Sequence, residues 1–123
     1  MFHESKLAQA AQFLCWGTGM PRREFLYSED LARACLFLMQ HYSEEQFINV
    51  GFGSDVTIKQ LAETIARIVG FDGAIQWDDS KPDGTPRKLM DSSRLFALGW
   101  EPQVDLETGI ELTYKGFLNE FRT

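Results

Sequence analysis

A chain of 123 residues can hold one domain with a modest core, and a second domain of ordinary size would not fit. With 44% hydrophobic and 13% aromatic residues, the chain has the composition of a folded protein and not of a disordered one. The formal net charge of −6 argues against a nucleic-acid partner, because binding the phosphate backbone requires a surplus of Lys and Arg on one face.

Two cysteines and the N-terminal residues bear on location. Cys15 and Cys35 lie within apolar runs without metal-ligand spacing, so we expect two buried free thiols in a reducing compartment. The first residues do not resemble a signal peptide, and no apolar run approaches the length of a membrane span. The sequence therefore predicts a cytoplasmic protein without a membrane partner.

Hydrophobic spacing in the first half predicts helices alternating with short strands. A helix without a cap of its own is expected over residues 2–12, and a second over residues 29–41 with Ser28 as its N-cap. Short strands are expected at residues 13–16, 23–27 and 47–50, the last of them buried.

The second half contains the clearest helix signal. Thr57 and Gln60 form a capping box, and Gly70 is placed to end the helix that follows. Residues 74–77 alternate as a strand does and lead into a polar loop over residues 78–88.

Two further helices complete the chain. Asp91 or Ser92 caps a short helix to Leu98, and Asp105 caps the last helix. The inward face of that last helix is expected to comprise Leu106, Ile110, Tyr114, Phe117, Leu118 and Phe121. The order of elements indicates a small mixed α/β fold.

The stretch from Trp16 to Phe25 is the first candidate binding site. Trp16 offers a flat aromatic surface, and the glycines that follow let backbone N–H groups approach an anion. Arg22 and Arg23 present planar sets of donors that match phosphate oxygens. The alternative is a surface turn whose arginines are merely solvated.

The loop from Lys81 to Lys88 is the second candidate. Asp83 can accept hydrogen bonds from hydroxyl or ring N–H groups, while Arg87 and Lys88 can meet phosphates. By composition alone a solvated polar loop is the better explanation. The presence of both stretches in one chain strengthens the binding hypothesis.

Other motifs carry less weight. The turn over residues 51–56 resembles a dinucleotide-binding loop, but Val56 replaces the third glycine and Asp55 places negative charge where a pyrophosphate would lie. A structural turn is the better interpretation. His3 and His41 lack partners at metal-ligand spacing, so no metal site is expected, and no nucleophile motif is present.

Five motifs stand out when the chain is considered as a whole: the Trp-Gly-Thr-Gly-Met-Pro-Arg-Arg-Glu-Phe-Leu-Tyr stretch, Asp-Leu-Ala at 30–32, Ile-Asn-Val-Gly at 48–51, Ser-Lys-Pro-Asp-Gly-Thr-Pro-Arg-Lys-Leu at 80–89 and Leu-Gly-Trp-x-Pro at 98–102. Together they resemble the C-terminal half of the GDP-L-fucose synthase family of extended short-chain dehydrogenases. The last motif occurs in many nucleotide-sugar enzymes, whereas the 80–89 loop is close to diagnostic.

The resemblance implies an NADPH-dependent epimerisation and reduction of a GDP-keto-sugar, with the chemistry in the N-terminal half of the enzyme. No catalytic residue is expected here, since Tyr27, Tyr42 and Tyr114 are not followed four residues later by lysine. The NADP site is likewise expected to lie outside this chain.

By motif match, Trp16 takes the place of a residue beside the nucleotide and Arg23 that of an arginine on the diphosphate. Asp83 matches an acid contacting the nucleotide, and Lys88 a lysine near the same ligand. Met1 stands where the family has a further substrate arginine, which suggests a chain that begins inside the enzyme.

The resulting expectation is an α/β substrate-binding domain over residues 1–123, lacking the Rossmann domain and inactive alone. Its partners would be the GDP-sugar and the missing N-terminal domain, in a full-length homodimer. The alternatives are a free-standing nucleotide-sugar binding module and a protein-interaction module.

Overall fold

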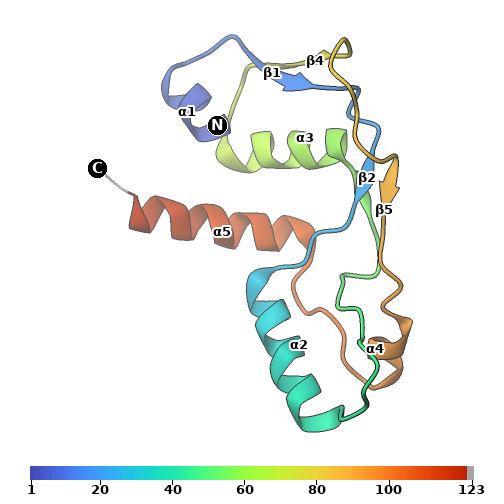
Figure 1. The fold of residues 1–123 in the computed structure, drawn as a ribbon. Helices are drawn as coiled ribbons and strands as arrows, with labels where there is room; N and C mark the ends of the chain where they lie inside the picture. Colours follow the sequence, from blue (N-terminus) through green and yellow to red (C-terminus); the bar gives the residue numbers. More distant parts are fainter. Residues whose placement is uncertain (122–123) are drawn as a thin grey trace.

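The computed structural model describes residues 1–121, and within this range the chain forms five helices and five short strands. Figure 1 shows an upper lobe and a lower lobe joined by a narrow strip of strands. The mixed α/β composition expected from the sequence is confirmed.

The upper lobe combines two parallel strands with two helices. Strand β1 (Gln12–Trp16) pairs in parallel with β4 (Ala74–Asp78), from Gln12 opposite Ala74 to Trp16 opposite Asp78. Helices α1 (Phe2–Leu7) and α3 (Ile58–Val69) lie below this pair in Figure 1.

Aromatic packing holds the upper lobe together. The rings of Phe2 and Phe13 stack with their centroids 4.1 Å apart, and the ring of Phe71 lies 5.7 Å from that of Phe2. Phe71 is buried beside the apolar face of α3. Burying such rings, roughly 150–250 Å² each, is the main favourable term available to so small a lobe.

Helix α3 begins and ends as its sequence predicts. The Thr57 side chain accepts from the Gln60 N–H, and the Gln60 side chain accepts from the Thr57 N–H, which completes the capping box. Gly70 closes the helix at φ +82°, a conformation that favours glycine.

The lower lobe packs helix α2 (Ser28–His41) against the short helix α4 (Ser93–Ala97). Ala34 and Leu95 are fully buried there, and Trp100 covers them. Partly buried hydrophobic side chains complete this core: Leu26, Phe37, Leu38, Ile48, Val50 and Phe96.

Asp30 is fully buried at the start of α2 and ties the lobe to the following segment. One carboxylate oxygen accepts from Arg33 at 2.5 Å, and the other accepts from the backbone N–H groups of Gln103 and Val104 at 3.1 and 2.9 Å. Burial raises the pKa of Asp30, but these hydrogen bonds outweigh it and hold the pKa below its usual value.

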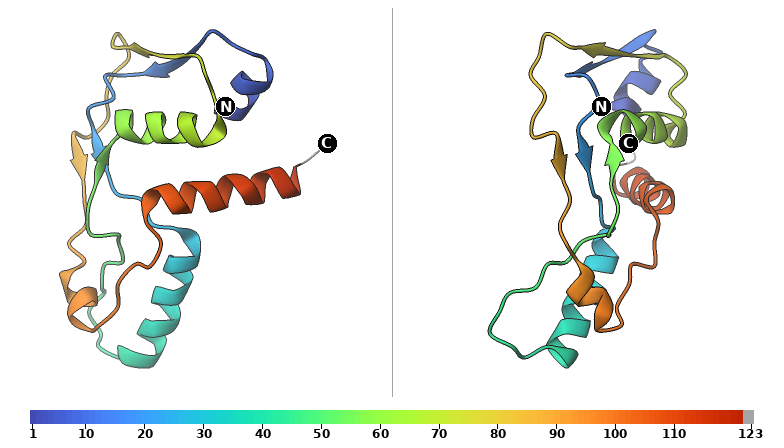
Figure 2. Two further views of the ribbon diagram at one scale, coloured as in Figure 1. Left: turned by 180° about the vertical axis from the view of Figure 1, so that it is seen from behind. Right: turned by 90° about the vertical axis from the view of Figure 1, so that its right-hand side faces the viewer.

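Three two-residue strands form the strip between the lobes. In the order β3 (Val56–Thr57), β2 (Arg22–Arg23) and β5 (Arg87–Lys88), β2 runs antiparallel to β3 and parallel to β5. The side view in Figure 2 shows the three strands lying next to one another.

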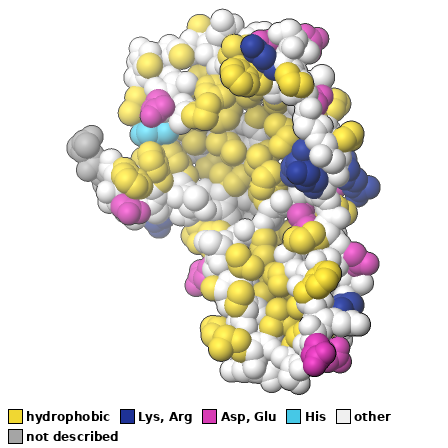
Figure 3. Space-filling view, in the orientation of Figure 1, with side chains coloured by type: hydrophobic (Ala, Val, Ile, Leu, Met, Phe, Trp, Pro, Cys, Tyr) yellow, Lys and Arg dark blue, Asp and Glu magenta, His cyan; other side chains and the backbone are white. Residues whose placement is uncertain are grey.

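Helix α5 (Leu106–Glu120) begins at Asp105, whose side chain accepts from the Thr108 N–H as predicted. It runs below α3 in Figures 1 and 2. An apolar groove of about 610 Å³ lies between the two helices, and Figure 3 shows hydrophobic side chains gathered on this face. The expected inward face of α5 thus borders this groove and is only partly covered: four of its six residues are half-buried, and Phe117 is 40% exposed.

The structure corrects several local predictions. Helix α1 ends at Leu7 rather than Gln12, because Gln9 adopts a left-handed backbone at φ +52°. Residues 47–50 form no strand: no segment within residues 1–121 pairs with them, and Phe47 is 87% exposed. Strand β2 covers only Arg22–Arg23, not residues 23–27.

Two side-chain predictions are also wrong. The N-cap of α2 is Tyr27, and Ser28 is already the first helical residue. Cys35 is exposed rather than buried, since it follows the fully buried Ala34 and so turns about 100° away on the helix. Cys15 is only half-buried, so it too departs from the prediction, and both cysteines are free thiols.

Within residues 1–121, no helix is long and apolar enough to span a bilayer.

Candidate functional site

The two candidate loops lie against each other. The Asp83 carboxylate accepts a 2.9 Å hydrogen bond from the Thr18 backbone N–H and a 2.6 Å bond from the Thr18 hydroxyl. Further along, the Arg22 N–H donates to the Pro86 carbonyl at 2.8 Å. These bonds hold residues 16–23 and 81–88 together at two points.

A pocket of about 120 Å³ opens where the loops meet. Trp16, Arg23 and Asp83 line it, together with Gly19, Pro21, Ile58, Pro82 and Gly84. Lys88 lies outside this lining but is the strand partner of Arg23 in the β2–β5 pair. The structure thus brings Trp16, Arg23 and Asp83 together in one pocket and places Lys88 beside it. The roles of these four residues toward a ligand remain predictions.

Trp16 presents an open aromatic surface. It is the last residue of β1 and 71% exposed, and the ammonium group of Lys81 lies 5.1 Å from a ring centroid. An exposed indole with a cation over one face is suited to stacking a flat ring or a sugar on its other face, beside a negative charge.

The Arg23 guanidinium lines the pocket and keeps donors available. Its Nη1 donates to the Arg22 carbonyl oxygen at 2.7 Å. No carboxylate of residues 1–121 lies within ion-pair distance of Arg23. The unused donors match the oxygens of a phosphate or diphosphate.

Asp83 is held as an ionised acceptor. The hydrogen bonds from the Thr18 hydroxyl and N–H lower the pKa of Asp83. Each carboxylate oxygen has a second lone pair, so Asp83 can also accept from a ligand hydroxyl or ring N–H. Gly17 permits this arrangement: its φ is +92°, and a Cβ there would lie 2.4 Å from the Asp83 Oδ1 atom.

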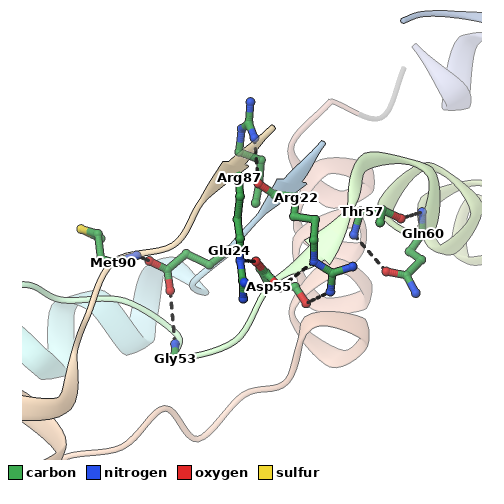
Figure 4. Close-up of polar contacts among 9 residues, drawn as sticks. Arg22, Glu24, Gly53, Asp55, Thr57, Gln60, Arg87 and Met90 are labelled. Atoms are coloured by element: carbon green, nitrogen blue, oxygen red, sulfur yellow. Dashed lines mark hydrogen bonds and ion pairs between the residues drawn. The ribbon is translucent and has the colours of Figure 1, made fainter. Parts of the chain in front are cut away.

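Two of the arginines proposed for phosphate are engaged elsewhere. The Nε atoms of Arg22 and Arg87 donate to the two carboxylate oxygens of Asp55 at 3.0 and 2.6 Å (Figure 4). Burial raises the pKa of Asp55, but the bonds from Arg87 and Arg22 outweigh it and lower the pKa overall. The expectation that Arg22 and Arg23 act as equivalent phosphate ligands is therefore corrected.

The glycine turn over residues 51–56 is occupied by a carboxylate of the protein itself. Glu24 accepts from the N–H groups of Phe52 and Gly53 at 3.0 and 3.2 Å through one oxygen, and from Met90 at 3.0 Å through the other. These are donors that a pyrophosphate would require. The residues therefore do not fit a dinucleotide cofactor, in agreement with the structural interpretation of this turn.

Sequence reasoning missed three residues of this region: Thr18, Glu24 and Asp55. Thr18 lies inside a glycine turn, where its sequence context does not indicate a contact with Asp83. Glu24 has the sequence context of an ordinary solvated surface charge. Asp55 was noticed only as unfavourable to a pyrophosphate. The only sequence feature that indicated burial of the Asp55 side chain was its position in a short polar turn, directly before an apolar strand residue.

The chain is similar in sequence to known proteins. A model described as "NAD dependent epimerase/dehydratase family" matches residues 2–51. The chain is 56% identical over 117 residues to "Probable GDP-L-fucose synthase 1" of Oryza sativa subsp. japonica, covering 95% of this chain and 36% of that protein. It is 45% identical over 126 residues to GDP-L-fucose synthase of Escherichia coli strain K12, covering 95% and 39%.

A solved structure agrees with these matches. The fold superposes on a GDP-L-fucose synthetase from Naegleria fowleri bound to NADP with a TM-score of 0.91 and 30% identity, covering 99% of this chain and 39% of that one. The fold therefore matches part of the extended short-chain dehydrogenase/reductase fold.

The particular relatives are GDP-L-fucose synthases, and over nearly its whole length the chain is homologous to part of them. The chain spans little more than a third of the length of these relatives.

Proposed function

We propose that this chain is the C-terminal, substrate-binding part of a GDP-L-fucose synthase. The whole enzyme would convert GDP-4-keto-6-deoxy-D-mannose to GDP-L-fucose by epimerisation and NADPH-dependent reduction. The observation that carries the proposal is the convergence of Trp16, Arg23 and Asp83 on one pocket, in a chain whose relatives are named for this activity.

Each residue has a role that follows from its chemistry. Trp16 covers a face of the base or ribose, and Arg23 donates to the diphosphate. Asp83 accepts from a hydroxyl or a ring N–H, and Lys88 adds a second positive charge beside Arg23. Together they bind a nucleoside diphosphate and leave the sugar free to reach toward another part of the enzyme.

The size of the pocket fits a partial site. Ligand pockets usually enclose roughly 300–1,000 Å³, whereas this one measures about 120 Å³. We therefore assign to it only part of the GDP-sugar. Binding energy gained on the nucleotide, away from the reacting carbons, would fix the sugar for reaction.

The proposal assigns no catalytic residue to this chain. NADPH, bound by the N-terminal part of the whole enzyme, would supply the hydride, and the catalytic groups would lie there too. We further propose a cytoplasmic homodimer as the working form of the whole enzyme. The free thiols of Cys15 and Cys35 support a reducing compartment.

A chimaeric enzyme tests the proposal directly. The segment of the rice protein that this chain matches would be replaced by residues 1–121, and GDP-L-fucose formation would be measured with NADPH. We expect turnover by the chimaera and none by the 123-residue chain alone. A folded chimaera that binds NADPH but does not bind the GDP-keto-sugar would refute the proposal.

A titration of the chain alone separates this proposal from a free-standing binding module. With part of the site missing, GDP should bind at millimolar concentration or not at all. Micromolar binding by the isolated chain would instead indicate a module that acts without a catalytic domain.

The apolar groove supports a second candidate, a protein-interaction module. Exposed apolar surface of this kind marks an interaction site or an aggregation hazard. Under this alternative the chain would self-associate through the groove, which light scattering would detect. Suppression of that self-association by an added NADP-binding domain would favour the first proposal.

A further inference from the structure

Asp55 connects strands β2 and β5, which carry Arg23 and Lys88. Its side chain is only 4% exposed, although it is charged. Its two oxygens accept from Arg22 on β2 and from Arg87 on β5, and the Arg22 Nη2 also donates to the Asp55 carbonyl at 3.4 Å. A single buried carboxylate thus connects one pocket loop to the other.

The strand register decides what this connection does. Arg22 lies opposite Arg87 in the β2–β5 pair, and Arg23 lies opposite Lys88. Successive residues of a strand point to opposite faces. Arg22 and Arg87 therefore point toward Asp55, whereas Arg23 lines the pocket on the other face of the strands. Lys88, the strand partner of Arg23, lies on that same face but outside the pocket lining.

We propose that Asp55 is a positioning residue, which sets Arg23 and Lys88 side by side by fixing the register of the strands beneath them. The inference rests on the proposed function, since it concerns the same pocket. A pair of two-residue strands has little backbone pairing of its own, so the two charge-assisted hydrogen bonds that the Asp55 carboxylate accepts add to what holds the strands in register.

A purely electrostatic role makes the opposite prediction. Asp55 is a negative charge near a site proposed for a diphosphate. If it acted through its charge alone, removing that charge would strengthen GDP binding. If it positions the strands, the same substitution weakens binding because Arg23 and Lys88 lose their common register.

The test uses the 123-residue chain and two readouts. Hydrogen exchange at the Arg22 amide, which donates to the Pro86 carbonyl, reports the contact between the loops without any ligand. An NMR titration with GDP reports binding. The variants are Asp55→Asn and Arg87→Lys. Arg87→Lys keeps the positive charge at residue 87 but lacks the Nε donor.

Matched controls accompany these variants. Asp79→Asn removes one carboxylate from an exposed position in the same 78–88 loop. Exchange at the Gly70 amide, which donates to the Ala66 carbonyl at the end of α3, monitors the intact helix. Asp55→Glu restores the carboxylate and should recover part of the wild-type behaviour.

We expect Asp55→Asn and Arg87→Lys to lose Arg22 protection and to raise the Kd for GDP about fivefold to tenfold, with Asp79→Asn within twofold of wild type. Unchanged Arg22 protection with equal or tighter GDP binding would overturn the inference. If Asp55→Asn does not fold, Arg87→Lys decides the same question. If the wild-type chain shows no response to GDP, as the proposed function allows for a partial site, the exchange result alone decides whether Asp55 fixes the strands. The proposed function is then judged separately, by turnover of the chimaera.

Discussion

The Asp83 carboxylate and Thr18 form two hydrogen bonds with each other, although they lie 65 positions apart in the chain. This contact makes one structural unit of two loops that look independent in the sequence. It also orients Asp83 toward the pocket that Trp16 and Arg23 line. Changes to either loop should therefore affect the other.

Arg23→Ala should weaken substrate binding by the rice chimaera. Loss of a charged hydrogen bond to a diphosphate corresponds to about 1–3 kcal/mol, observed as a fall in kcat/KM. Arg67→Ala is the matched control, because Arg67 pairs with Glu107 between α3 and α5 and lies outside the pocket. An Arg23→Ala chimaera with unchanged kcat/KM would exclude the diphosphate role.

Gly17→Ala should destabilise the chain and impair the pocket. The new methyl group would collide with Asp83, and the positive φ of residue 17 is unfavourable for alanine. We therefore expect the free energy of unfolding to fall by about 1–2 kcal/mol. Gly116→Ala is the control: its Cβ would meet open space on α5, and the gain in helix propensity should be about 0.5–1 kcal/mol. Urea denaturation measures both changes, and equal effects of the two substitutions would contradict the expectation.

Asp30→Asn should be the more damaging of two neighbouring charge removals on α2. It replaces a buried acceptor of bonds from Arg33, Gln103 and Val104, at a cost of about 2–3 kcal/mol. Glu29→Gln removes a 65% exposed carboxylate that pairs loosely with Arg33, and its effect should stay below about 0.5 kcal/mol. Thermal unfolding compares them, and a cost for Glu29→Gln as large as that for Asp30→Asn would refute this assignment.

The free energy of unfolding should fall in acid, because the lowered pKa of Asp30 makes its contribution to stability depend on pH. Its pKa is lower in the folded chain than the roughly 3.9 of an unperturbed aspartate. The stability that it contributes is therefore complete above about pH 4 and is lost as the pH falls through the folded-state pKa. The difference in unfolding free energy between wild type and Asp30→Asn should shrink as the pH falls below about 4, and a difference that grew there would show the opposite sign.

Thr18→Val should separate the turn from Asp83 without changing any charge. The substitution removes the hydroxyl that donates to Asp83 and accepts from the Met20 N–H, while the Thr18 backbone bond to Asp83 remains. We expect GDP affinity to fall about threefold to tenfold with little loss of stability, because one neutral donor is exposed to water. The NMR titration described above measures this, with Thr64→Val on α3 as a control that loses only a bond to its own helix.

Local signals in the sequence predicted the helix ends whose hydrogen bonds are made within a few residues. The capping box at Thr57, the left-handed Gly70 and the Asp105 cap all act within a few residues, so their patterns sufficed to place α3 and the start of α5. Residues 47–50 show the limit of such signals. Their apolar character predicts burial, but a strand also needs a partner, and none of residues 1–121 provides one.

The amino-acid sequence alone determined the α/β class, the best helices and the two loops with binding chemistry, because residue type, spacing and family motifs are local properties. Only the tertiary structure decided that Arg22 and Arg87 hold Asp55 while Arg23 faces the pocket. That division depends on the pairing of β2 with β5, a contact between residues 65 positions apart. Side chains alternate along a strand, but which of them face the pocket cannot be predicted until the pairing register of the two strands is known.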